Sequence, residues 1–295
     1  MRAVPKCLPC IVDDLCGAVD IEISDEAVKS AVLSKALHYL AENFSFDHPP
    51  SMFITGVHRI FKKVSKNKTP FASRRTVCNE VGVKLAEELK HRARAMRGLA
   101  RFSFFVRWAL AGNHLDFRTV GTGYGFDVGR TEAMLESAAQ RLVVDRTDEL
   151  YREVTRRPRI LYVHDNVGEI ALDALLIEEM RSLGAYVVSG LRGGPITSDA
   201  TVEDAKSVGL DAVADEIIKV GPDTLGISFE EMSKRCIKEL QKADLVVAKG
   251  QANYYNFSEN RQLVPGRIAC LLRTKCDLVA GILGGEGHIS VATFL

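Results

Sequence analysis

The stretch Arg159-Ile160-Leu161-Tyr162-Val163-His164-Asp165-Asn166-Val167-Gly168-Glu169 decides the fold. An apolar run ends at Val163, and an amphipathic helical pattern starts at Glu169. This order is typical of a buried strand, a turn and a helix. In α/β proteins, functional side chains gather at the carboxyl ends of the strands. We therefore expect the turn that contains Asp165 and Asn166 to belong to a functional site.

More short apolar runs follow at regular intervals and alternate with helical patterns. Together with 160–163, the expected strands are 186–189, 217–220, 245–248 and 268–272. Strands that alternate with helices indicate βαβ units, and these predict a mainly parallel sheet.

The first half of the chain has a different pattern. From Glu22 to about Arg141 it is helical, with almost no β-branched runs. The segment Ser24-Asp25-Glu26-Ala27 offers an N-cap for the first long helix, and Pro49-Pro50 separates that helix from the next, at 53–64. The glycine-rich segment 121–129 follows no strand, so we interpret it as a linker or lid and not as a dinucleotide loop. We predict a helical region with this connector at 1–145 and an α/β domain at 146–295.

Composition excludes several classes of function. The chain has 295 residues and is 46% hydrophobic, enough for a large core. Its net charge of +1 gives no electrostatic case for binding nucleic acid or an anionic membrane. It has no apolar run near the roughly 20 residues of a membrane span and no signal-peptide pattern. We expect a cytoplasmic protein; its oligomeric state stays open.

Acids and amides at the expected strand ends suggest a metal site. Asp165 lies beside Asn166, and Asp199 follows the next strand. A buried acid at a strand end needs a partner, and a cation is a natural one. Asn166 and Glu169 also have the spacing of a helix capping box, and a lone aspartate such as Asp199 more often caps a helix. Both interpretations stay open at this point.

Two further clusters can meet the same edge. Asn113 and Asp116 follow an apolar helical stretch, and Lys249 ends the strand at 245–248. A lysine beside Gly250 suits a phosphate oxygen, because glycine permits close backbone approach. Oxygen ligands together with a lysine suggest a hard cation that holds a phosphate.

Cys7-Leu8-Pro9-Cys10 is a single Cys-x-x-Cys pair among seven cysteines. No second pair stands at zinc-ligand spacing, and no strand precedes the motif as a thioredoxin-type site requires. We favour a structural role for Cys7 and Cys10, while their actual role stays open.

The motifs together resemble the damage-control phosphatase family, formerly domain of unknown function 89. They are Asp165-Asn166-Val167-Gly168-Glu169, Gly112-Asn113-His114-Leu115-Asp116, Ser198-Asp199-Ala200-Thr201 and Lys249-Gly250-Gln251-Ala252-Asn253-Tyr254. The opening Cys-x-Pro-Cys resembles the branch found in archaea and some bacteria. Family members often carry Asp-Pro-Phe/Tyr, whereas Thr69-Pro70-Phe71 lacks that acid.

The resemblance implies a Rossmann-like α/β/α sandwich after an N-terminal helical region, and a metal-dependent phosphatase. It implies Asp165, Asn166 and Asp199 as metal ligands. The implied substrate or phosphate contacts are Asn113, Asp116, Glu169, Lys249 and Asn253.

We expect direct hydrolysis of small phosphorylated metabolites, such as sugar phosphates, cofactor intermediates or their damaged forms. A divalent Mg, Mn, Co or Ni ion would polarise a phosphoryl oxygen and lower the pKa of a bound water. The sequence does not choose whether Glu169 or Asp116 orients that water. Two alternatives are an S-adenosylmethionine-dependent methyltransferase and a non-catalytic redox or metal-binding module built around Cys7 and Cys10.

Overall fold

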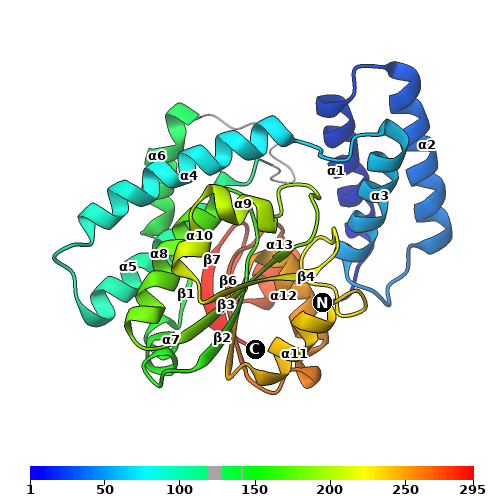
Figure 1. The fold of residues 1–295 in the computed structure, drawn as a ribbon. Helices are drawn as coiled ribbons and strands as arrows, with labels where there is room; N and C mark the ends of the chain where they lie inside the picture. The colour runs from blue at the N-terminus through cyan, green and yellow to red at the C-terminus, as the bar shows by residue number, and fades with distance from the viewer. Residues whose placement is uncertain (118–127, 141) are drawn as a thin grey trace.

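The computed structural model describes residues 1–117, 128–140 and 142–295. In this part of the chain one seven-stranded sheet has the order β1-β7-β6-β5-β2-β3-β4 (Figure 1). All its pairs are parallel except β6 with β7. The strands are β1 (Val144–Asp145), β2 (Arg159–Val163), β3 (Tyr186–Arg192), β4 (Glu216–Gly221), β5 (Leu245–Lys249), β6 (Arg267–Arg273) and β7 (Ser290–Phe294).

The predicted α/β fold with a mainly parallel sheet is confirmed, and the five expected strands are β2 to β6. The strands β1 and β7 were not predicted. β1 has two residues, too few for a periodic signal. β7 follows a glycine-containing turn after α13 (Asp277–Ile282) and returns antiparallel beside β6.

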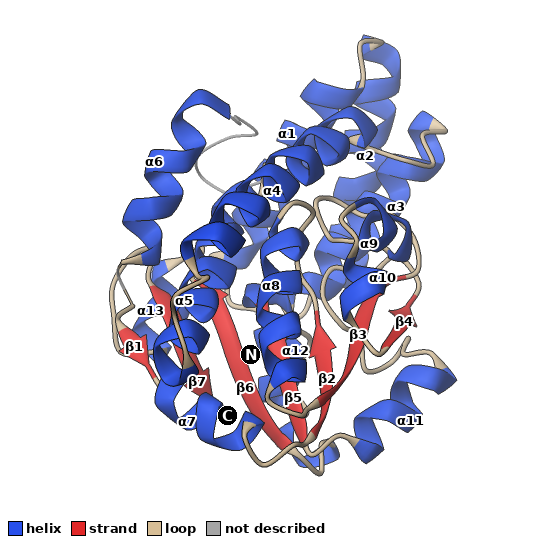
Figure 2. Ribbon diagram, turned by 60° about the vertical axis from the view of Figure 1, so that its left-hand side comes forward, coloured by secondary structure: helices blue, strands red, loops and turns tan. Residues whose placement is uncertain are grey.

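Helices cover both faces of the sheet and give three layers (Figure 2). One face packs its apolar side chains against helices that include α4 (Ala72–Arg92), α5 (Gly98–Ala111) and α8 (Glu169–Ser182). The other face packs against α11 (Lys234–Lys242), α12 (Gly250–Glu259) and α13. The remaining helices are α6 (Val128–Ala139), α7 (Thr147–Val154), α9 (Val202–Ser207) and α10 (Leu210–Val213), with 3-10 turns η1 (Gly112–Leu115) and η2 (Arg261–Leu263).

The first three helices form a group of their own at one side of the molecule (Figure 1). They are α1 (Cys7–Glu22), α2 (Glu26–Asn43) and α3 (Pro50–Ser65), and they share a separate apolar core that Leu225 and Ala252 join. The predicted N-cap is confirmed, because the Asp25 carboxylate accepts hydrogen bonds from two backbone amides at the start of α2. Helix α1, which contains Cys7 and Cys10, lies ahead of the helical pattern found in the sequence.

The division of the chain at residue 145 stays a prediction. Helices α4 and α5 precede that boundary and pack against α8. Of the glycine-rich segment interpreted as a linker or lid, residues 121–127 lie outside the described residues. Among the helices that the structure describes, none is long and apolar enough to cross a membrane.

Gly250 joins β5 to α12 in a conformation that suits glycine. Its φ is 77°, in the left-handed region. A Cβ atom placed there would lie 1.9 Å from Oδ2 of Asp165. The turn after β5 therefore approaches the turn after β2 so closely that a side chain at Gly250 would displace the Asp165 carboxylate.

We expect Gly250→Ala to lower the melting temperature and to move Asp165. The left-handed conformation costs an alanine about 1–2 kcal/mol, which corresponds to roughly 2–8 °C for a chain of this size. Differential scanning fluorimetry measures the shift. Gly281→Ala is the matched control, because a Cβ at Gly281 meets nothing within 4 Å. Equal melting temperatures for the two variants would contradict the packing described here.

Candidate active site

A cavity of about 390 Å³ lies at the carboxyl edge of the sheet and contains the three predicted metal ligands. Asp165 and Asn166 come from the turn after β2, and Asp199 comes from the loop after β3. The wall also includes residues of α1, of α3 and of the segment after β6. Other lining residues are Cys7, Cys10, Ile11, Ile54, Ser198, Leu225, Gln251, Lys275 and Cys276.

Backbone pairing fixes the two loops that carry these ligands. Asn166 and Asp199 form an isolated antiparallel bridge. The Val167 amide donates to the Ser198 carbonyl at 2.9 Å, and the Ala200 amide donates to the Asp165 carbonyl at 2.7 Å. The sequence prediction that Asp165, Asn166 and Asp199 meet at one edge thus agrees with their positions, while their role as ligands stays a prediction.

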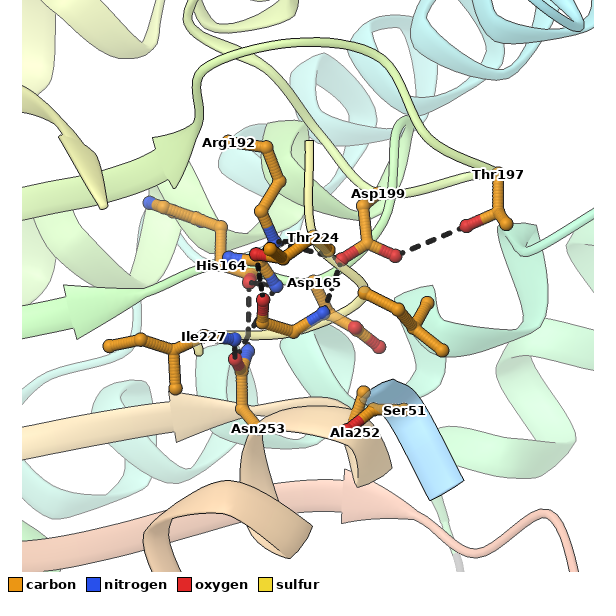
Figure 3. Close-up of polar contacts among 12 residues, drawn as sticks. Ser51, His164, Asp165, Arg192, Thr197, Asp199, Thr224, Ile227, Ala252 and Asn253 are labelled. Carbon is orange, nitrogen blue, oxygen red and sulfur yellow. Dashed lines mark hydrogen bonds and ion pairs between the residues drawn. The ribbon is translucent and has the colours of Figure 1, made fainter. Parts of the chain in front are cut away.

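Asp199 is held by a buried arginine (Figure 3). Its Oδ2 accepts hydrogen bonds from Nε of Arg192 and from the Gly226 amide, both at 2.9 Å. Arg192 ends β3 and is fully buried. The sequence analysis missed Arg192, because an arginine at the end of a strand is expected to be exposed. Its burial is explained by its partner, Asp199.

Asn253 connects three segments instead of facing the cavity (Figure 3). Its Nδ2 donates to the carbonyls of His164 and Lys249 at 2.9 and 2.7 Å, and its Oδ1 accepts from the Ile227 amide at 2.7 Å. These bonds tie α12 to the end of β2. The predicted contact between Asn253 and substrate stays a prediction.

The side chains of Asn113 and Glu169 contact those of Asp165 and Asn166, two of the predicted ligands. Nδ2 of Asn113 donates to Asp165 Oδ2 and to Glu169 Oε2, both at 3.1 Å. Nδ2 of Asn166 donates to the same two oxygens at 2.8 and 3.2 Å. Two amide groups therefore hold two carboxylates side by side, and all four side chains are buried.

Of the capping box predicted for Asn166 and Glu169, the structure has only one bond, in which Glu169 Oε2 accepts from the Asn166 backbone amide at 3.4 Å. Helix α8 begins at Glu169 with Gly168 as its N-cap, and no side chain caps it. The side chain of Asn166 turns to the two carboxylates instead. Thr201 and Asp204 do form a capping box at the start of α9, which leaves Asp199 available at the cavity.

Lys249 is buried behind Glu169. Its ammonium donates to the Ala109 carbonyl at 2.8 Å and to Asp173 Oδ1 at 2.7 Å, and it forms an ion pair with Glu169. These three acceptors match the three donors of an ammonium group. The sequence predicted that Lys249 contacts phosphate, and that role stays a prediction; the observed contacts are those of a residue that positions Glu169.

Asp173, which the sequence analysis missed, completes the buried network. Its carboxylate also accepts from the Tyr162 hydroxyl at 2.8 Å and contacts His164 Nδ1 at 2.9 Å. It stands four residues after Glu169 on α8, a spacing that places both acids on one helix face.

Asp116 lies beside a second lysine that was also missed. It forms an ion pair with Lys275, which follows β6 and lines the cavity. The Lys275 backbone amide donates to Oε1 of Gln251 at 2.7 Å. Lys275 could have been identified from the sequence by its position just past the end of a predicted strand. The same kind of position identified Lys249.

Burial and neighbouring charges together shift the pKa values of these acids in opposite directions. Burial and the charge of Glu169 raise the pKa of Asp165 to about 8. Burial also raises the pKa of Glu169, against the opposing effect of Lys249. Burial acts on Asp173 too, but the charge of Lys249 and the His164 hydrogen bond outweigh it and lower its pKa. Positive charge therefore offsets burial at Asp173, but not at Asp165 and Glu169.

The donor set fits a hard divalent cation. Carboxylate and amide oxygens of Asp165, Asn166 and Asp199 are the ligands that Mg²⁺ and Mn²⁺ prefer. Within the described parts of the chain, no three His, Cys, Asp or Glu side chains form a ready-made metal group, so any such site depends on the amide. A cation beside Asp165 would supply the charge that its raised pKa shows to be missing.

We expect Lys249→Met to destabilise the protein by about 3–5 kcal/mol, because removal of one partner leaves buried carboxylates unpaired. Without Lys249, burial raises the pKa values of Glu169 and Asp173. Their protonated forms are then preferred, so the deficit is smaller at pH 5 and grows as the pH rises to 8.

Urea unfolding at pH 5 and at pH 8 measures the loss in free energy of unfolding of Lys249→Met. Lys206→Met, at an exposed position, is the control. A deficit below about 1 kcal/mol at pH 8, the scale of a surface ion pair, would contradict the proposed role of Lys249.

The chain is similar to known proteins over nearly its whole length. Residues 3–289 match the sequence profile of the damage-control phosphatase ARMT1-like domain. The chain is 30% identical to a damage-control phosphatase of Archaeoglobus fulgidus, covering 96% of both proteins. It is also 30% identical to a damage-control phosphatase of Pyrococcus horikoshii, covering 95% of this chain and 93% of that protein.

The fold has a solved relative as well. The crystal structure of a DUF89 family protein from Pyrococcus horikoshii superposes with a TM-score of 0.88 at 30% identity. The match covers 100% of this chain and 99% of the other. The chain therefore belongs to the damage-control phosphatase family, also called domain of unknown function 89.

Proposed function

We propose that this protein is a metal-dependent phosphatase that hydrolyses small phosphorylated metabolites. The observation that carries the proposal is the cavity in which Asp165, Asn166 and Asp199 meet. Membership of the damage-control phosphatase family supports it. The methyltransferase alternative gains no support from that membership.

In this proposal Asp165, Asn166 and Asp199 hold a divalent cation of the Mg, Mn, Co or Ni class. When bound, the cation supplies Lewis-acid chemistry to a phosphoryl oxygen and to water. The chain fixes the donors in advance: Arg192 orients Asp199, and Asn113 orients Asp165.

Lys275 is the residue that we assign to the phosphoryl oxygens. It lines the cavity with the three ligands, and its side chain is 19% exposed, whereas Lys249 is fully buried. Asp165 lines the same cavity, and the charge of Lys275 opposes the rise in the pKa of Asp165. Lys249, Asn113 and Asn253 then have positioning roles.

Asp116 is better placed than Glu169 to orient the attacking water. Asp116 is buried but paired with Lys275, which lines the cavity, whereas the Glu169 carboxylate is enclosed by Asn113, Asn166 and Lys249. We therefore assign water orientation to Asp116 and positioning of the ligands to Glu169.

The substrate class follows from the shape and walls of the cavity. Its volume of about 390 Å³ suits a small molecule, and Ile11, Ile54 and Leu225 add apolar surface beside the polar floor. Sugar phosphates, cofactor intermediates and their damaged forms are the compounds to screen. The cytoplasmic location stays a prediction.

The proposal is tested by phosphate release from p-nitrophenyl phosphate. We expect metal-stripped protein to be inactive and to recover with Co, Ni, Mn or Mg. Asp165→Ala should lose at least about 100-fold in kcat, because it removes a ligand of the Lewis acid. Asp211→Ala, an exposed acid on α10, is the control and should match the wild type. Full activity of the stripped protein or of Asp165→Ala would overturn the proposal.

The roles of Asp116 and Glu169 can be distinguished when activity and metal binding are measured on the same variants. We expect Asp116→Asn to lower kcat about 10²- to 10⁴-fold, the usual contribution of a general base. Its metal-induced rise in melting temperature should equal that of the wild type. Glu169→Gln should reduce that rise, because it alters the support of Asp165 and Asn166. The reverse pattern would reassign the two residues.

A further inference from the structure

Three cysteines line the cavity that contains the predicted metal ligands. Cys7 and Cys10 come from the first turn of α1, and Cys276 is the N-cap of α13. None of the three forms a disulfide, and all are partly exposed. The phosphatase proposal uses none of them. Three thiols from two parts of the chain at one cavity suggest a chemistry of their own.

Helix geometry singles out Cys7 and Cys10 as a pair that can be bridged. Residues three apart on an α-helix have Cα atoms about 5 Å apart, from a rise of about 1.5 Å and a turn of about 100° per residue. A disulfide needs a Cα separation of about 4.4–6.8 Å. Cys16, on the same helix, is about 10 Å from Cys10 by the same geometry and cannot bridge to it.

We propose that Cys7 and Cys10 form a reversible thiol–disulfide site in the wall of the candidate active-site cavity. The oxidant is a low-molecular-weight disulfide. The thiolate of one cysteine attacks it, forms a mixed disulfide and releases one small thiol. The thiolate of the other cysteine then attacks the protein sulfur, closes the Cys7–Cys10 bond and releases the second small thiol. Two protein thiols are oxidised, and one small disulfide is reduced to two thiols.

The site differs from a thioredoxin-type catalyst. Burial raises the pKa of Cys7, although the Val4 amide, which donates to its Sγ at 3.5 Å, opposes this effect. Catalytic Cys-x-x-Cys motifs instead have a lowered pKa. The Cys7 thiol is therefore suited to slow, stoichiometric oxidation of this protein itself, not to turnover of other disulfides.

The bond would alter the cavity. It draws two sulfur atoms that line the cavity to about 2.05 Å from each other. The same wall faces the space beside Asp165, Asn166 and Asp199. We therefore expect oxidation to change substrate binding, an effect that rests on the proposed phosphatase function.

The bond itself is tested by mass spectrometry of the folded protein treated with oxidised glutathione. A Cys16→Ser background leaves Cys7 and Cys10 as the cysteines of the tryptic peptide from residue 7 to residue 29. We expect that peptide to lose two hydrogens and dithiothreitol to restore them. The buried Cys78, Cys236 and Cys270 should stay reduced. With Cys7→Ser added, Cys10 should retain a glutathione adduct.

Lasting glutathione adducts on both Cys7 and Cys10, unreacted thiols, or a bridge to Cys276 would overturn the proposal. The second readout is KM for p-nitrophenyl phosphate in the Cys16→Ser protein, oxidised and reduced. We expect oxidation to change KM at least about twofold, and to leave KM unchanged in the variant in which Cys7, Cys10 and Cys16 are all serine. An unchanged KM in an active enzyme would contradict the proposed effect of the Cys7–Cys10 bond on the cavity. A bridge in a protein that shows no activity in either state would support the thiol site and contradict the phosphatase proposal.

Discussion

The buried ammonium of Lys249 is the interaction on which the candidate site depends. It lies between Glu169 and Asp173, and all three side chains have no solvent exposure. Two carboxylates on one face of α8 would otherwise repel each other in a medium where unpaired charge costs several kcal/mol. Glu169, which is paired with Lys249, accepts hydrogen bonds from the amide groups of Asn113 and Asn166. Those amides in turn hold Asp165 at the cavity.

The rest of the fold places two further parts next to this network: the loop after β3, which carries Asp199, and the N-terminal helices that cover the cavity. The bridge between Asn166 and Asp199 joins the turns after β2 and β3, so the predicted ligands are fixed by backbone as well as by side chains. Helices α1 and α3 then close one side of the cavity. Thr55 on α3 accepts a hydrogen bond from the Leu225 amide at 3.0 Å, and Arg59 pairs with Asp223. This docking also places Cys7 and Cys10 of α1 in the cavity wall.

Sequence reasoning predicted the features that depend on local pattern. The strands β2 to β6 follow from short apolar runs, and the convergence of Asp165, Asn166 and Asp199 follows from the carboxyl ends of parallel strands. It missed features that depend on partners far along the chain. In the sequence, Asp173 resembles any other acid on a helix. Its role depends on Lys249, which lies 76 residues later at the end of β5. Lys249 looks like a phosphate-binding lysine until α5 supplies the Ala109 carbonyl.

The most direct test of the metal site is a crystal structure of the protein grown with manganese, examined by anomalous scattering. If Asp165, Asn166 and Asp199 hold the cation, the strongest anomalous peak lies within about 2–2.5 Å of one oxygen from each side chain, the usual range for hard cations. The peak should vanish in Asp199→Ala. A strongest peak beside Cys7, Cys10 and Cys276, or no peak in the cavity under conditions that support activity, would contradict the metal assignment.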